Sequence, residues 1–211
     1  RRPRLAGLRA PAAAWSAWLW AAPALLLGAA LYVWARYTGA SELQILARCL
    51  ECTALVLLRW GAPGLRALWL PIAFLLLAVP LPAPLLLAVV FKLQMWTAQY
   101  AGWLLYVLGV PVLVSGDQIL RATESFQVIE GCSGMRSIET LTMLTILLAD
   151  LFRRHGLHAA ILVLAAPPLA FFLNGFRVLT LILNPHSEIV AVHNFQGIAI
   201  LLVGLTLLYG L

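Results

Sequence analysis

Apolar runs separated by short polar links make up most of this chain, and their lengths set the first prediction. The runs over 12–35, 135–152, 157–183 and 193–211 are each close to the roughly 20 residues that a helix needs to cross a bilayer. The first run is too long for the apolar core of a signal peptide and lacks a clear cleavage site, so we expect it to be retained. We therefore predict that each run forms a membrane-spanning helix.

Three further apolar segments precede residue 110. We predict that 43–60 and 67–79 cross the membrane and that the link RWGAPGLR forms a loop between them. The prolines of PLPAP at 80–84 end the preceding helix. The segment 85–110 is long enough to span, but polar residues interrupt its middle. It is either a span that lines a polar cavity or a kinked, partly interfacial helix. These polar residues are Lys92, Gln94, Thr97 and Gln99.

The segment 110–131 differs from its surroundings, because polar and apolar residues alternate in stretches such as SFQVI. This period of two is typical of a β-hairpin or an extended segment. The segment leads into EGCSGMRS at 130–137 and then into the next apolar run. The whole pattern predicts an all-α polytopic integral membrane protein, a bundle of about six or seven transmembrane helices with a short hairpin-like segment before Cys132.

Composition agrees with a membrane protein and excludes a water-soluble domain. The 211 residues are 63% hydrophobic and only 10% charged, whereas soluble domains carry about 25% charged residues. The net charge of +6 reflects 14 basic against 8 acidic residues, which in a membrane chain indicates topology rather than nucleic-acid binding. We expect a single transmembrane domain over 1–211, with variable spans over 1–64 and a catalytic core over 65–211.

Arginines predict which ends of the spans face the cytoplasm. The start RRPRLAGLR and the arginine pair that ends the run 135–152 both mark the inner side. Cys132, at the other end of that run, is then at the outer face. Arg177 lies about 30 Å of helical rise beyond Leu157, so it also reaches the outer face. His193 opens the last span on the same side.

The same sidedness constrains the middle of the chain. Because 67–79 leads outward and Cys132 lies outside, the segment 80–131 must cross the membrane an even number of times. The simplest solution makes 85–110 interfacial or re-entrant.

Cys132 is either a small buried residue at a tight turn or a nucleophile. A cysteine at a helix N-terminus lies among unpaired N–H groups at the positive end of the helix dipole, which lowers the pKa of a thiol. Gly131 and Gly134 let a substrate backbone approach closely. The N–H groups of Ser133 and Gly134 can cradle a developing oxyanion. These features favour the nucleophile.

Two residues on other spans supply the partners that a thiol nucleophile needs. Arg177 either extends to lipid head groups or faces the bundle interior, and Asn174, three residues earlier on the same face, favours the interior. His193 is either a histidine without a task or a base that titrates near neutral pH. Cys132, Arg177 and His193 together form a set for acyl transfer: nucleophile, oxyanion stabiliser and base.

Other polar residues are weaker candidates. Arg136 and Glu139 lie one turn apart, so they either pair with each other or Arg136 binds an acidic group of the substrate. Cys49 and Cys52 form CLEC on a predicted span, but no further ligands accompany them. We expect neither a metal nor an organic cofactor.

Three motifs taken together resemble the exosortase/archaeosortase family. They are CSG at 132–134, NGFRV at 174–178 and HNFQG at 193–197, in this order and separated by one helical hairpin. The resemblance covers most of residues 65–211, including the proline-rich break and the polar segment before the cysteine. By this resemblance, Cys132 is the nucleophile, Arg177 the transition-state stabiliser and His193 the general acid/base.

The resemblance implies a multi-span enzyme of the cytoplasmic (inner) membrane whose active site faces the periplasm or the outside. Such enzymes are cysteine transpeptidases, a type of thiol protease, that act on exported proteins. Their substrates end in a short motif, a hydrophobic helix and a basic tail, as in the PEP-CTERM type. The cleaved protein then passes to an acceptor, which we expect to be an amine of unknown identity. These systems are often linked to exopolysaccharide production.

Two other functions are compatible with the sequence. One is a polytopic transporter or channel in which Arg177, Asn174 and Lys92 line a polar path, although no inverted repeat is visible. The other is a non-catalytic subunit of an envelope polysaccharide assembly system. The bilayer is the expected environment in every case, and nucleic acid is not an expected partner.

Overall fold

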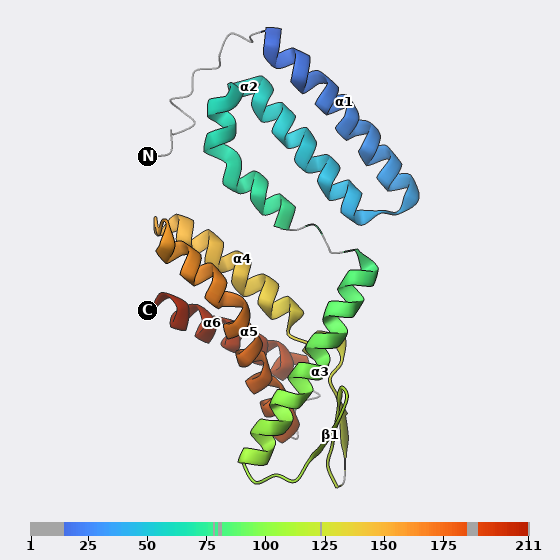
Figure 1. Ribbon diagram of the computed structural model, residues 1–211, viewed down its shortest axis with the longest axis vertical. Helices are drawn as coiled ribbons and strands as arrows, with labels where there is room; N and C mark the ends of the chain where they lie inside the picture. The colour runs from blue at the N-terminus through green and yellow to red at the C-terminus, as the bar shows by residue number, and fades with distance from the viewer. Residues whose placement is uncertain (1–14, 78, 80–81, 123, 185–189, 211) are drawn as a thin grey trace. The chain divides into compact units, whose positions relative to one another are not determined.

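The computed structural model describes residues 15–77, 79, 82–122, 124–184 and 190–210, and the description of side chains begins at 18 in the first helix and at 195 in the last. Helices account for most of these residues (Figure 1). The elements in chain order are α1 (Trp15–Thr38), α2 (Ser41–Leu77), α3 (Ala83–Val107), β1 (Leu113–Ser115), β2 (Gln118–Leu120), β3 (Ser125–Gln127), the 3-10 turn η2 (Glu130–Cys132), α4 (Met135–Leu151), α5 (Leu157–Leu183) and α6 (Val190–Tyr209).

The chain divides into two compact units, Arg1–Ala83 and Pro84–Leu211. Helices α1 and α2 pack together in the first unit. Charged groups of α2 pair with each other: Arg48 Nη1 lies 2.7 Å from Glu51 Oε2. The Arg48 guanidinium also stacks 3.8 Å from the centre of the Tyr32 ring on α1. Pairing of this kind lowers the cost of charges in an apolar helix.

The predicted loop between 43–60 and 67–79 is wrong. Two helical segments meet directly at Gly61, which has φ 65° and ψ −160°, and together they form α2. Glycine adopts such a conformation without a steric penalty, so the chain changes direction at one residue. Pro63 follows at the start of the second segment, where a missing N–H costs little.

The predicted hairpin is confirmed as a three-stranded antiparallel sheet of order β1-β2-β3. Val114 pairs with Ile119, and Ile119 pairs with Phe126. Ile119 is fully buried in a core that α3 and α5 complete with Ala98, Ala101, Leu105, Val178, Leu179 and Ile182. The sheet therefore packs its inner face on two helices rather than extending free from them.

Helix α3 is continuous over 25 residues. Whether 85–110 crosses the membrane, re-enters it or lies at the interface stays a prediction. The Tyr100 ring of α3 packs against α5, where a side chain at Gly175 would collide with it. Further along α3, Ala101 and Leu105 share one core with Val178 and Ile182, which come later on α5. Later residues of one helix thus meet later residues of the other, and α3 runs in the same sense as α5 (Figure 1).

Helices α4, α5 and α6 form the remainder of the second unit (Figure 1). Their shared core contains Leu141, Leu162, Ala166, Ala170 and Leu208. Tyr209 donates a 2.7 Å hydrogen bond from its hydroxyl to the carbonyl of Thr145, which ties the end of α6 to α4.

Three helices in the described part of the chain are long and apolar enough to cross a membrane: Trp18–Thr38, Ser41–Leu77 and Leu157–Leu183. A shorter apolar stretch covers Phe195–Tyr209 of α6. The membrane class is therefore supported, and the count of about six or seven crossings stays a prediction.

Candidate active site

Cys132 lies in a tight turn that precedes α4. Its backbone N–H donates to the Ile129 carbonyl at 2.9 Å, and the N–H of Ser133 donates to the Glu130 carbonyl at 3.1 Å. Gly134 then has φ 91°, a left-handed conformation that suits glycine, and redirects the chain into the helix. Cys132 therefore belongs to the turn before α4, and the first residue of the helix itself is Met135.

Side chains from α3 and α5 hold the backbone of this turn. Asn174 Nδ2 donates to the Cys132 carbonyl at 2.9 Å, and Thr97 Oγ1 donates to the Ser133 carbonyl at 3.2 Å. Just upstream, Gln94 Nε2 donates to the Val128 carbonyl at 2.8 Å. Buried carbonyls need such partners because water cannot reach them. We call Gln94, Thr97 and Asn174 the carbonyl clamp.

The clamp explains polar residues that the sequence left ambiguous. Gln94 and Thr97 lie three residues apart on an apolar helix and so share a face. That spacing indicates a shared polar environment, but the two carbonyls that they bind are more than thirty residues away along the chain. Neither Gln94 nor Thr97 was predicted as a site residue. Lys92 and Gln99 are exposed and take no part in the clamp.

Arg177 lies on the face of α5 that carries Asn174 and is 9% exposed. It is close enough to Cys132 for its charge to act on the thiol. Burial raises the pKa of Cys132, and the positive charge of Arg177 lowers it by less, so the pKa lies above its ordinary value. The expectation of a lowered pKa is therefore wrong, because loss of hydration outweighs the favourable charge.

The structure brings Cys132, Ser133, Gly134, Asn174 and Arg177 into one region. Ser133 is fully buried, and its N–H already donates to the Glu130 carbonyl, so of the predicted pair this N–H is taken. A side chain at Gly134 would lie 3.0 Å from Asn174 Nδ2. The Asn174 side chain therefore both limits the space at Gly134 and holds the Cys132 carbonyl.

Three other residues named in the sequence analysis do not join this group in the described structure. His193 belongs to α6, but its side chain lies outside the described residues, and its role as a base stays a prediction. Arg136 and Glu139 are both exposed on α4 and do not form an ion pair with each other. Within the part of the chain that the structure describes, no three His, Cys, Asp or Glu side chains are grouped to hold a metal ion.

A sequence model of the transmembrane exosortase family (Exosortase_EpsH) matches residues 1–210. The chain belongs to this family. The match extends over both compact units and confirms the resemblance noted from the three motifs. Neither a curated protein nor a solved structure matches the chain.

Proposed function

We propose that this chain is a membrane-embedded cysteine transpeptidase or protease. It cleaves the C-terminal sorting signals of exported proteins at the outer face of the cytoplasmic membrane. The substrate remains tethered by its hydrophobic C-terminal helix, which docks against the bundle and presents the motif to Cys132. The observation that carries the proposal is the clamped turn, which fixes a cysteine beside the buried Arg177 in a chain of the exosortase family.

The raised pKa of Cys132 gives His193 a defined task. Burial keeps Cys132 mostly as a thiol at neutral pH, so a base must accept its proton before attack. The resulting thiolate attacks the scissile carbonyl carbon, while Arg177 and the Gly134 N–H stabilise the developing oxyanion. The C–N bond then breaks, and protonated His193 gives the proton to the leaving amine.

The acyl group remains on Cys132 as a thioester. An amine acceptor attacks the thioester carbonyl, loses a proton to His193 and releases the thiol, which completes transpeptidation. Water in place of the amine gives hydrolysis. Because each step moves protons only among these side chains, the substrate and the acceptor, the proposal includes no cofactor.

The test is co-expression of a tagged substrate that ends in a motif, a hydrophobic helix and an arginine-rich tail. We expect Cys132→Ala, Arg177→Ala and His193→Ala to abolish processing, as measured by immunoblot. Cys49→Ala and Cys52→Ala are matched controls, since both are free cysteines on α2 with no proposed role, and they should process normally. Full processing by Cys132→Ala would remove the nucleophile from the proposal.

A further inference from the structure

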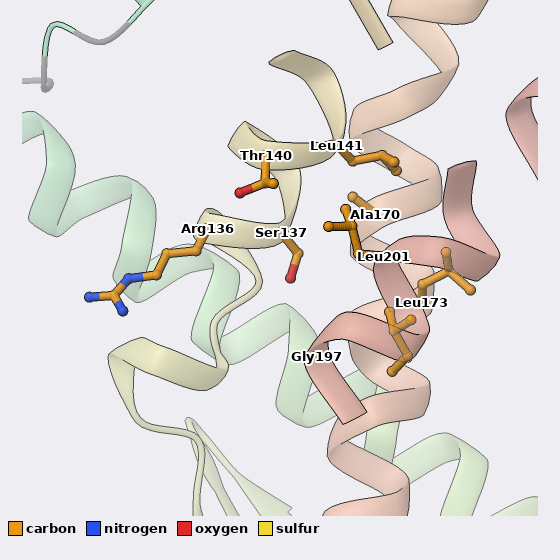
Figure 2. Close-up of a pocket in the computed structure, with 9 residues that line it drawn as sticks. Arg136, Ser137, Thr140, Leu141, Ala170, Leu173, Gly197 and Leu201 are labelled. Atoms are coloured by element: carbon orange, nitrogen blue, oxygen red, sulfur yellow. The ribbon is translucent and has the colours of Figure 1, made fainter. Parts of the chain in front are cut away.

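A cavity of about 130 Å³ lies among α4, α5 and α6 (Figure 2). Ser137 and Thr140 of α4 supply hydroxyl groups to its wall, and Figure 2 shows the Arg136 side chain extending away from the other lining residues. Most of the remaining lining is aliphatic: Leu141, Ala170, Leu173, Ile200 and Leu201. The cavity therefore favours an uncharged, mainly apolar group.

Two helices bring the lining of this cavity near the turn that bears Cys132. Ser137 lies in the first turn of α4, which begins directly after the turn that bears Cys132. On α5, Leu173 directly precedes Asn174, whose amide binds the Cys132 carbonyl. Since a helical turn rises about 5.4 Å, the lining begins within about one turn of the clamped backbone on both helices.

Gly197 leaves the third wall open. A Cβ built at Gly197 would meet no atom within 4 Å, although this residue lines the cavity. Further along the same helix, a Cβ at Gly204 would lie 3.0 Å from Leu173 and 3.2 Å from Leu141. Gly204 thus allows α6 to pack closely on its neighbours, whereas Gly197 leaves unfilled space at the cavity wall.

We propose that this cavity is a specificity pocket for one aliphatic side chain, of about the size of valine or leucine, on the residue whose carbonyl Cys132 attacks. This inference rests on the proposed function. Pockets for whole small molecules measure about 300–1,000 Å³, whereas an apolar cavity of about 150 Å³ holds a single benzene ring. The cavity therefore suits part of a substrate, and a charged side chain would lie there without a partner.

The experiment measures how the side chain of a small electrophile affects alkylation of Cys132. The probes are N-acetylated glycine, alanine, valine, leucine and tryptophan chloromethyl ketones, applied to the full chain in detergent. Peptide mass spectrometry reports alkylation at Cys132, with Cys49 and Cys52 as internal references. We expect the leucine probe to react at least about tenfold faster than the glycine probe at Cys132, because methylenes in a fitted pocket change rates by about that factor.

Filling the cavity should remove this preference. We expect Gly197→Leu to slow the leucine probe to the rate of the glycine probe, with the glycine rate unchanged. Gly197→Ala should give an intermediate preference and guards against misfolding of the larger variant. Leu202→Phe is the control, because Leu202 is 57% exposed on the same helix and should leave all rates unchanged.

Equal rates for the glycine and leucine probes in the unmodified chain would overturn the pocket assignment, as would an equal slowing of every probe by Gly197→Leu. Occupation of the cavity by a lipid acyl chain would give the first of these results. The assay is independent of substrate processing. Processing without a side-chain preference refutes the pocket alone, and a preference without processing refutes the proposed function while the pocket beside Cys132 stands.

Discussion

Gly134 links the turn that bears Cys132 to the carbonyl clamp, and its replacement by alanine tests both. The residue has φ 91°, where a Cβ costs about 1–2 kcal/mol. The new Cβ would also lie 3.0 Å from Asn174 Nδ2 and 3.2 Å from its Cγ, which is closer than ordinary contact. Moving that amide weakens a half-buried hydrogen bond worth about 0.5–1.5 kcal/mol. We expect Gly134→Ala to destabilise the protein by about 2–3 kcal/mol.

Two other glycines separate the backbone contribution from the contact. Gly116 also has positive φ, 63°, but a Cβ there meets nothing within 4 Å, so Gly116→Ala should cost about 1–2 kcal/mol. Gly131 is equally open and has no positive φ, so Gly131→Ala should change stability by less than about 0.5 kcal/mol. The expected order of destabilisation is Gly134, then Gly116, then Gly131.

The assay is unfolding in mixed micelles by SDS titration, followed by tryptophan fluorescence. A double-mutant cycle with Asn174→Ala isolates the contact, because removal of the amide should lower the additional cost of Gly134→Ala to that of backbone strain. If Gly134→Ala costs no more than Gly116→Ala, or if its cost is unchanged without Asn174, then the amide does not constrain this glycine.

Two further outcomes follow from the site. Gln94→Leu should destabilise the protein by about 1–3 kcal/mol in the same assay, because it leaves the buried Val128 carbonyl without its donor, whereas Gln99→Leu on the exposed face should be nearly neutral. Equal effects would show that the clamp contributes nothing. The rate of Cys132 alkylation by iodoacetamide should still rise with pH above the ordinary thiol range, since burial raises the pKa of Cys132. Arg177→Gln removes the charge that lowers this pKa, so its profile should shift to higher pH. A shift to lower pH would contradict the placement of Arg177.

Much of the helical architecture could be predicted from the sequence. The runs 135–152 and 157–183 correspond to α4 and α5 within a residue, and the alternation before Cys132 predicted the sheet. These features depend on local periodicity, which a single segment displays by itself. The motifs around Cys132 and Arg177 also indicated the family, which the match over 1–210 confirms.

The wrong loop and the open question at 85–110 both arose where a local pattern permits two structures. RWGAPGLR contains the residues of a loop, yet one glycine with positive φ suffices to join two helical segments. The polar residues of 85–110 left open a span that lines a polar cavity or a kinked, partly interfacial helix, and the structure shows what two of these residues bind. In the folded chain Gln94 and Thr97 are satisfied by carbonyls of a distant turn, so α3 stays continuous.

The sequence by itself indicated that this is a membrane protein and which segments are helical, and it proposed Cys132 as a nucleophile and Arg177 as its cationic partner. Only the tertiary structure decided that α3 and α5 clamp the turn of Cys132, and that burial outweighs Arg177 in the balance that sets the thiol pKa. Hydrophobic periodicity acts within a segment, whereas hydrogen-bond partners and desolvation depend on groups that meet only after the chain has folded.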